Sequence, residues 1–330
     1  MQLIGRMRGF ISRLSQVSET ETAFDRVQYL EINADQAGQR IDNFLLSRLK
    51  GVPKSRVYRL LRKGEVRVNK GRIRPEYRLS ENDVLRIPPI RVAKQVSAVP
   101  GRSLRGVLAA SIVMETEDFL VINKPSGLAV HGGSGINLGV IESLRAMREP
   151  HAYLELAHRL DRDTSGCLLI AKSRRVLKHL QDQMRQRSMD KRYMTLVSGR
   201  WAKERREVNA PLLKQTVASG ERIVRANREG KASLTRFKLL QHYANASLLE
   251  VKLETGRTHQ IRVHCQLVGH PLAGDPKYGN ENFNQVMRAV GLKRLFLHAA
   301  ELAFTSPATG ERIKVEAALP DELKTLLKQL

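Results

Sequence analysis

The segment from residue 37 to residue 97 most constrains the fold, because it combines helical apolar patterns with a high concentration of positive charge. It holds 16 Lys and Arg against 5 Asp and Glu, a net of +11 in 61 residues, whereas the whole chain of 330 residues carries +24. Apolar residues recur at helical spacing on both sides of Pro53, and proline suits the first turn of a helix. Gly64 is placed to end the second helix, and the alternating residues after it predict a short hairpin that turns at 69–71. The segment therefore predicts two short helices and a hairpin with a basic outer surface.

The charge of the whole chain predicts a polyanionic partner. Lys and Arg total 57 against 33 Asp and Glu, and such a surface attracts phosphate groups over long range, so nucleic acid is the first candidate. The mean hydropathy is −0.35 and no run of eighteen apolar residues occurs, which argues against a membrane partner. The two cysteines, Cys167 and Cys265, are too few for a disulfide framework and lack metal-ligand spacing. We therefore expect a cytoplasmic protein.

Composition and periodicity divide the chain into four segments. Residues 1–36 are predicted to be an N-terminal extension, in which arginines interrupt the apolar run that a secretory signal needs. Residues 37–97 form the basic domain, and residues 98–111 read as a linker because they hold Pro and Gly without periodicity. Residues 112–330 contain recurrent strand-like runs and one helix at about 174–187. This larger domain is predicted to be mixed α+β with an antiparallel-rich sheet.

The basic segment resembles a known RNA-binding module. The strings GQRIDNFL, VPKSRVYRLLRKGEVRVNKGRI and DVLRIPP, within about residues 37–90, are similar to the S4 RNA-binding domain. A merely solvated charged face is the alternative, but a uniform cationic stripe along one helix favours RNA contact. The candidate RNA-binding residues are Lys54, Arg56, Arg59, Arg62, Lys63, Arg67 and Lys70.

A second feature is the string HRLDRDTSG at 158–166. Asp161 lies between Arg159 and Arg162, just before a predicted strand, so it belongs to a loop at a sheet edge. Opposite charge nearby favours the ionised carboxylate, which suits nucleophilic or base chemistry better than acid chemistry. Taken alone, the string is better explained by a structural ion pair, since such pairs also gather charges.

Three further motifs change that interpretation. NKPSGLAVHGG at 123–133, KRYMTLVSG at 191–199 and ETGRTHQIRVH at 254–264 occur around HRLDRDTSG in a fixed order. From about residue 37 onward, the chain resembles the RluA-type family of pseudouridine synthases. The resemblance implies an α+β protein: a small S4 domain, then a catalytic domain built on a mixed, mainly antiparallel sheet with flanking helices and loops. It also implies that specific uridines of 23S large-subunit ribosomal RNA are isomerised to pseudouridine without a cofactor or metal.

The resemblance assigns roles to single residues. Asp161 is the implied catalytic residue, and Arg262 is implied to pair with it. Tyr193 is implied to pack by the target base, with C5 proton abstraction as a candidate role, and Arg159 to displace or replace the flipped base. The same motifs supply further candidates for the active-site loops, namely Lys124, His131, His158 and Arg257.

The implied chemistry agrees with these residue types. The reaction breaks the N1–C1′ bond and rejoins uracil through C5, so the uridine must flip out of its stack at a cost of a few kcal/mol. A carboxylate can attack C1′ or assist loss of the 2′ proton to give a glycal, and both routes stay open. Tyr193 offers a stacking face worth about 1–3 kcal/mol to an extruded base, although a tyrosine that only fills the core is the alternative.

Two other functions use some of the same features. A non-catalytic S4-type RNA-binding or ribosome-assembly protein would need the basic domain only, and a glycosylase would use a carboxylate at C1′ but release free base. A metal site at His259, His264 and Cys265 is disfavoured, because the interval puts the histidines on opposite faces of the strand predicted there. The expected partners are large-subunit ribosomal RNA or ribosome assembly intermediates, with no membrane and a monomeric protein.

Overall fold

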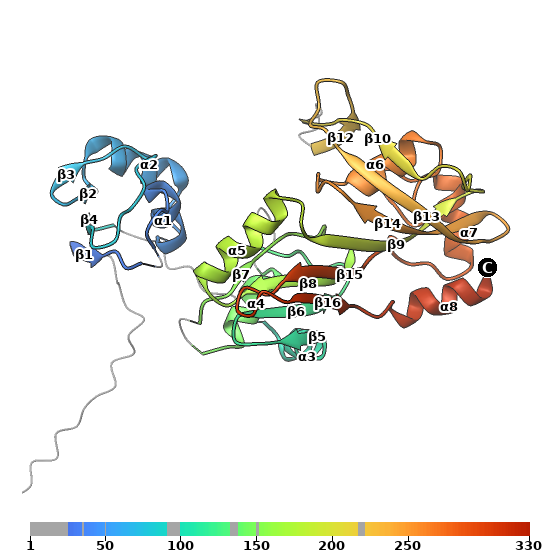
Figure 1. Ribbon diagram of the computed structural model, residues 1–330, viewed down its shortest axis with the longest axis horizontal. Coiled ribbons are helices and arrows are strands. Elements are labelled where there is room, and N and C mark those ends of the chain that lie inside the picture. Colours follow the sequence, from blue (N-terminus) through green and yellow to red (C-terminus); the bar gives the residue numbers. More distant parts are fainter. Residues whose placement is uncertain are drawn as a thin grey trace, which may run out of the picture. The chain divides into compact units, whose positions relative to one another are not determined.

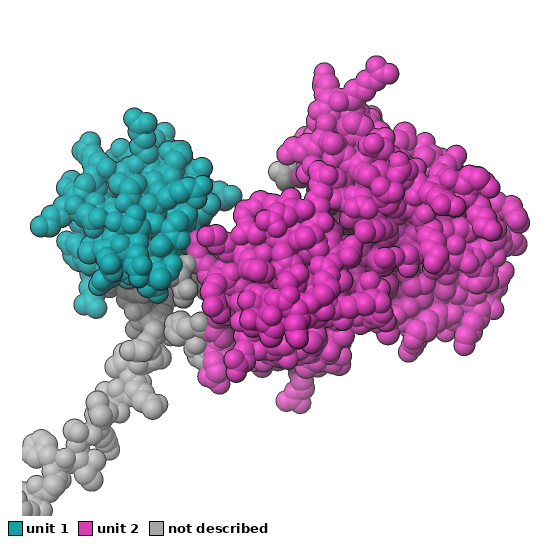
Figure 2. Space-filling model, in the orientation of Figure 1, with its two compact units in different colours: residues 1–96 teal, residues 97–330 magenta. Residues whose placement is uncertain are grey.

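The computed structural model describes residues 26–34, 36–49, 51–90, 100–132, 138–149, 152–216 and 222–330. They form two compact units, one within residues 1–96 and one within residues 97–330 (Figure 2).

The first unit is a four-stranded antiparallel sheet packed against two helices (Figure 1). Pro53 immediately precedes the second helix, and Gly64 ends it with a φ of +69° that glycine adopts without steric cost. Asn69 and Lys70 both have positive φ, 49° and 67°, as a tight hairpin turn requires. The elements are β1 (Gln28–Glu31), α1 (Ile41–Arg48), α2 (Lys54–Lys63), β2 (Arg67–Val68), β3 (Gly71–Arg72) and β4 (Val84–Ile87), and the strand order is β1-β4-β2-β3.

The unit begins earlier in the sequence than its charge pattern indicates. Strand β1 pairs with β4 along its whole length, and Ile32 just after it is fully buried in the core of the unit. The prediction of an extension over residues 1–36 is therefore wrong for 28–32. The strand is too short to show a period, and its pairing partner lies more than fifty residues away in the sequence.

The second unit is built on one ten-stranded mixed sheet, which confirms the predicted α+β class (Figure 1). The path runs β10-β13-β14-β9-β15-β8-β6-β5, with β16 beside β15 and β7 beside β8. Strands β15 and β8 run parallel, and every other pairing among the described strands is antiparallel. The strands are β5 (Ile112–Glu115), β6 (Phe119–Lys124), β7 (Glu155–Leu156), β8 (Ser165–Ala171), β9 (Asp190–Ser198), β10 (Glu207–Asn209), β13 (Leu234–His242), β14 (Ala246–Leu253), β15 (Leu297–Thr305) and β16 (Arg312–Glu316).

Six helices and a separate hairpin complete the described part of the second unit. Helix α5 agrees with the helix predicted at about 174–187, and Val176 and Leu180 on it are buried. The hairpin pairs β11 with β12 apart from the main sheet. These elements are α3 (Arg102–Ala110), α4 (Val140–Ala146), α5 (Arg174–Arg185), β11 (Leu212–Thr216), β12 (Arg222–Ala226), α6 (Gln260–Leu267), α7 (Glu281–Ala289) and α8 (Asp321–Gln329).

Two segments differ from their predictions. Residues 102–110 lie within the predicted linker 98–111 but form α3, whose Leu108 is fully buried in the main core. Residues 260–267, predicted as a strand, form the helix α6. Both helices are stabilised by burial in the second unit, and a short stretch of sequence does not show that burial.

The parallel pairing of β8 with β15 requires a glycine. Gly166 has a φ of +110°, and a Cβ there would lie 2.2 Å from the backbone oxygen of Ala299 on β15. This close approach lies directly after the loop that carries Asp161. It joins that loop to the middle of the sheet, where Tyr193 on β9 lies one strand beyond β15.

Candidate active site

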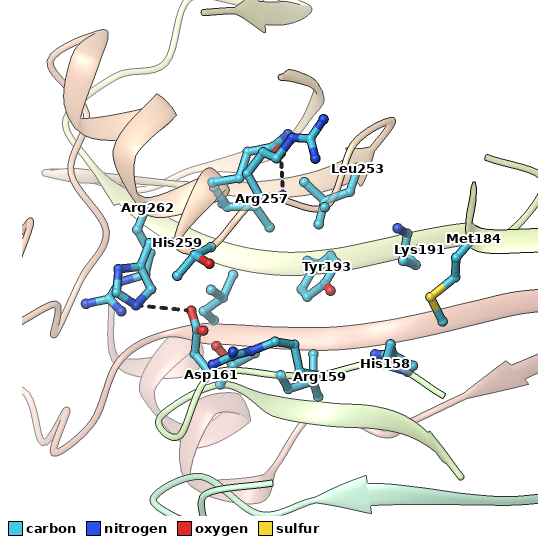
Figure 3. A pocket seen from close by; sticks show the side chains of 17 residues that line it. His158, Arg159, Asp161, Met184, Lys191, Tyr193, Leu253, Arg257, His259 and Arg262 are labelled. Carbon is cyan, nitrogen blue, oxygen red and sulfur yellow. Dashed lines mark hydrogen bonds and ion pairs between the residues drawn. The ribbon is translucent and has the colours of Figure 1, made fainter. Parts of the chain in front are cut away.

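A pocket of about 280 Å³ lies where three segments of the second unit meet (Figure 3). The loop before β8 forms one wall, β9 forms the floor, and residues 253–262 between β14 and α6 form the opposite wall. Figure 3 shows the ring of Tyr193 between the loop that carries Asp161 and the segment that carries Arg257. The pocket brings together six of the eight active-site candidates, namely His158, Arg159, Asp161, Tyr193, Arg257 and Arg262.

The other two candidates do not line this pocket. His131 is exposed on the segment after β6. Lys124 is fully buried, and its ammonium donates hydrogen bonds to the carbonyls of Pro125, Leu128 and Arg162 at 2.8, 2.9 and 2.9 Å. Because the Arg162 carbonyl lies one residue after Asp161, this hydrogen bond anchors the backbone of the loop that carries Asp161. Burial lowers the pKa of this ammonium to about 7, and the three carbonyls match its three donors.

Asp161 lies within ion-pair distance of His259. The carboxylate Oδ2 lies 3.8 Å from Nε2 of this histidine, and the two side chains are 21% and 18% exposed (Figure 3). Burial lowers the pKa of His259, the charge of Asp161 raises it, and burial dominates. The imidazole is therefore neutral at neutral pH.

A hydrogen-bond chain behind His259 favours one tautomer. The Val224 amide donates to the hydroxyl oxygen of Tyr278 at 3.0 Å, and this hydroxyl lies 2.8 Å from Nδ1 of His259. Nδ1 is the one described acceptor within hydrogen-bond reach of this hydroxyl, so it can take the phenolic hydrogen. Nε2 then carries the ring proton and directs it toward Asp161.

Arg262 pairs with Asp275, not with Asp161 as the resemblance implied. Its Nε and Nη2 each donate to the Asp275 carboxylate at 2.7 Å, in a bidentate pair whose side chains are 6% and 0% exposed. The guanidinium also lies over the ring of Tyr278, 4.9 Å from its centroid. These two hydrogen bonds commit Nε and Nη2 of Arg262 to Asp275. Arg262 therefore acts on Asp161 through its positive charge.

Tyr193 lies on β9 with its side chain almost fully buried in the pocket. Burial, with a smaller contribution from the charge of Asp161, raises the pKa of its phenol well above the ordinary value of 10. The phenol therefore keeps its proton at neutral pH. Its ring is a packing face in the middle of the pocket.

The remaining candidates differ in how firmly they are held. Arg159 is exposed and makes no hydrogen bond or ion pair with the described residues. The Nε2 of His158 accepts a hydrogen bond from the Leu169 amide at 3.1 Å, and burial lowers its pKa to about 4. Arg257 donates through Nε to the carbonyl of Ala232 at 3.2 Å. Arg159 is therefore the most adaptable of the three.

Sequence reasoning missed four residues of this site. The motifs indicate His259 only as a candidate metal ligand, and they do not single out Lys191, Tyr278 or Asp275. Lys191 precedes Tyr193 by two residues on a strand, so the KRY motif was a signal that both side chains share a face. No local pattern signals that Tyr278 and Asp275 reach back to α6.

The described part of the chain holds no cluster of three or more His, Cys, Asp or Glu side chains that could bind a metal ion. No helix among the residues that the structure describes is long and apolar enough to cross a membrane.

The first unit carries the candidate RNA-binding residues on α2 and the hairpin. Six of them are exposed and Arg56 is half-buried. The side chains of Lys54, Arg59, Arg62 and Lys63 make no hydrogen bond or ion pair with the described residues, so they are available to a ligand.

Comparisons with known proteins agree with this geometry. Residues 118–267 match the family model of RNA pseudouridylate synthase, and residues 39–85 match that of the S4 domain. Over 316 residues the chain is 55% identical to ribosomal large subunit pseudouridine synthase C of Salmonella typhimurium, covering 94% of this chain and 98% of that protein. It is 51% identical over 319 residues to the Pasteurella multocida protein of the same name, covering 96% and 98%. Among solved structures, human RNA pseudouridylate synthase domain containing 4 matches with a TM-score of 0.56 at 25% identity, over 69% of this chain and 95% of that chain.

Proposed function

The chain belongs to the RNA pseudouridylate synthase family and is an RNA pseudouridine synthase, and we propose that it modifies specific uridines of 23S ribosomal RNA with Asp161 as catalytic carboxylate. The names of the relatives support a large-subunit ribosomal substrate. The net charge of +24 and the free cations on α2 supply the attraction that a large RNA requires. The proposed targets are the uridines at positions 955, 2504 and 2580.

The observation that carries the catalytic assignment is the position of one carboxylate. Among the described residues that line the pocket, Asp161 is the single Asp or Glu. It faces a space bounded by the Tyr193 ring and by the wall from Leu253 to Arg262. A pocket of about 280 Å³ with one carboxylate suits a single flipped nucleoside.

The reaction is an isomerisation, so atoms and charge balance within the nucleotide. The N1–C1′ bond breaks, uracil turns, a C5–C1′ bond forms, and the proton lost from C5 is balanced by one gained at N1. Asp161 either attacks C1′ and is displaced by C5, or takes the proton from C2′ as the N1–C1′ bond breaks and returns it to C2′ of the glycal as C5 bonds to C1′. The Nε2–H of His259 faces the same carboxylate and can orient it by a hydrogen bond once the pocket closes around a base.

Base flipping can use Tyr193 to receive the extruded base and Arg159 to fill the gap that it leaves in the RNA. The buried Tyr193 ring offers the extruded uracil a stacking face worth about 1–3 kcal/mol, which offsets part of the unstacking cost. Arg159 is exposed and unpaired among the described residues, so its guanidinium can occupy the position in the RNA that the base leaves. The high pKa of Tyr193 means that a proton-abstracting role would require a base to take its phenolic hydrogen first.

The direct test replaces Asp161. We expect Asp161→Asn to lower pseudouridine formation at least about a thousandfold while RNA affinity stays within a few-fold, because this carboxylate contacts no phosphate. Asp163→Asn is the matched control, since Asp163 lies in the same loop but its carboxylate pairs with Arg162 outside the pocket. Normal turnover by Asp161→Asn would refute the assignment.

The substrate is tested in cells. Pseudouridines in total ribosomal RNA are mapped with and without the gene, and the proposal expects the loss of the three 23S sites when the gene is absent. In a separate assay, the purified enzyme should release no free uracil from RNA, because such release would indicate a glycosylase. Unchanged 23S modification would exclude these targets.

The role of Tyr193 has its own test. Tyr193→Phe keeps the ring, so stacking and RNA affinity should persist, while any step that uses the hydroxyl should slow. A fully active Phe variant would refute proton abstraction by Tyr193. Tyr193→Ala should weaken binding of the flipped base by about 1–3 kcal/mol.

A further inference from the structure

Lys191 is a charged side chain of the pocket that the reaction described above does not use. It lies two residues before Tyr193 on β9, so both side chains project from the same face of the strand. In Figure 3, Lys191 and Asp161 lie on opposite sides of the Tyr193 ring, and Met184 lies beside Lys191. Lys191 is therefore at the end of the pocket away from the catalytic carboxylate.

The ammonium of Lys191 makes no hydrogen bond or ion pair with the described residues. Burial lowers its pKa, and the negative charge of Glu254 opposes part of that shift. The Glu254 carboxylate is itself paired with Arg236 at 3.0 Å. A partly buried positive charge without a partner is costly to the free protein, so an anionic ligand would bind there with little competition.

A second cavity of about 340 Å³ adjoins the pocket at this point. It shares Met184, Lys191, Gly256 and Arg257 with the first cavity, so these four residues lie between the two spaces. Its remaining lining includes Arg185 and Arg187 at the end of α5. Four cationic side chains therefore surround a space whose one described carboxylate is Glu254.

The cations of this cavity differ in availability. Arg185 is paired with Asp182, whereas the guanidinium of Arg187 makes no hydrogen bond or ion pair with the described residues. Arg257 uses Nε for the Ala232 carbonyl, which leaves its two terminal nitrogens free to donate. Lys191, Arg187 and Arg257 can therefore converge on one anion from three segments of the chain.

We propose that Lys191, with Arg257 and Arg187, forms a subsite for one backbone phosphate of the RNA next to the flipped uridine. The proposal rests on the proposed function, because the flipped nucleoside in the first cavity places its own phosphodiester within reach of the second. A nucleotide held by its phosphate and by the Tyr193 ring is fixed at two points. C1′ is then presented to Asp161 at the opposite end of the pocket.

The test is a double-mutant cycle between protein and RNA. The probe is a short RNA that contains a uridine modified by the wild-type enzyme, made with a neutral methylphosphonate linkage 5′ or 3′ of that uridine, or four nucleotides away. All probes carry 2′-O-methyl groups at the same nucleotides, which keeps the neutral linkages stable and the arms matched. Dissociation constants are measured for wild type, Lys191→Met, Lys191→Arg and the exposed control Lys203→Met.

We expect Lys191→Met to weaken binding of the fully charged RNA about tenfold, as loss of a charge-assisted contact does. Its salt dependence should fall by about 0.7 in the slope of log K against log salt. With the neutral linkage at one of the two adjacent positions, wild type should weaken similarly and Lys191→Met should add little. Lys191→Arg should restore affinity to the charged RNA, and Lys203→Met should behave as wild type.

Additive losses at both adjacent positions would overturn the subsite. So would a Lys191→Met variant that binds as tightly as wild type. Either result leaves the proposed function intact if wild type still converts the unmodified RNA. Failure of wild type to bind or convert any 23S fragment would instead count against the proposed function.

Discussion

Helix α2 of the first unit and the wall of the pocket in the second unit hold their charged side chains in opposite ways. On α2 of the first unit, Lys54, Arg59, Arg62 and Lys63 are exposed and unpaired among the described residues. Around the pocket of the second unit, the Arg262–Asp275 pair is buried and held by two hydrogen bonds of 2.7 Å. Exposed charges attract RNA without fixing its position, whereas buried ones fix the position of groups that do chemistry. The difference predicts that substitutions on α2 change RNA affinity, and that substitutions behind the pocket change stability and turnover.

The strongest test of this difference removes one member of the buried pair. Arg262→Gln leaves the Asp275 carboxylate buried without its counterion, and we expect the second unit to lose about 3–5 kcal/mol of stability. The fluorescence of Trp201, the one tryptophan of the chain, reports unfolding of this unit in urea. The control Lys324→Gln opens an exposed pair with Asp321 and should cost under about 1 kcal/mol. Equal losses would remove the distinction between buried and exposed charge.

The half-buried His158 gives the next largest effect, and it depends on pH. Its pKa is about 4 in the folded protein against a usual 6.5, so the unfolded chain binds more protons between these values. The free energy of unfolding therefore falls as pH falls through this window, by about 2 kcal/mol between pH 7 and pH 5. His158→Gln keeps an acceptor for the Leu169 amide and should lose less stability over this range. Parallel pH profiles for the two proteins would show that His158 is not the group responsible.

The Tyr278 hydroxyl extends the comparison to the hydrogen bonds beside Asp161. Tyr278→Phe removes the donor to Nδ1 of His259 and leaves the Val224 amide unpaired, at about 1–2 kcal/mol. We expect turnover to fall about tenfold with RNA affinity unchanged, and nitrogen-15 NMR should show His259 losing its Nε2–H preference. Tyr243→Phe is the control, because the Tyr243 hydroxyl makes no hydrogen bond with the described residues. An unaltered tautomer in Tyr278→Phe would contradict the proposed hydrogen-bond chain.

The smallest effect on folding should come from α2 itself. Neutralising Arg59, Arg62 and Lys63 together should leave stability within about 0.5 kcal/mol, since these side chains lack partners to lose. RNA binding should weaken, and its salt dependence should flatten by about 0.7–0.9 log units for each lost phosphate contact. Turnover at saturating RNA should not change. An unchanged salt slope would show that this helix does not contact RNA.

Local signals predicted the first unit well. In the structure, α2 begins directly after Pro53 and ends at Gly64, as the sequence pattern predicts. The hairpin turns at Asn69 and Lys70. These residues act through their own backbone preferences, which no tertiary contact has to supply. The strand β1 was missed because only its pairing with β4 defines it.

The helix α6 shows why the catalytic domain was harder to predict. Its residues from Gln260 to Cys265 are all buried, so the polar and apolar positions do not separate onto two faces. Gln260 and His264 are satisfied internally, by Thr255 and Thr235 among others, which lets polar side chains alternate with Ile261 and Val263 as in a strand. Motifs could place Asp161 and Tyr193 near one another. They could not show that Asp275, thirteen residues beyond Arg262, takes the partner expected for Asp161.

The pairing of β8 with β15 gives the pocket an unusual origin. Asp161 belongs to the half of the sheet that contains β5, β6 and β8, whereas Tyr193 and α6 belong to the half that contains β9, β13 and β14. The halves meet at a seam in which β15 matches β8 at two positions only, His298 with Ser165 and Ala299 with Gly166. The active site therefore spans this seam, with the loop before β8 on one side and β9 on the other. A side chain added at Gly166 would push the two halves of the sheet apart.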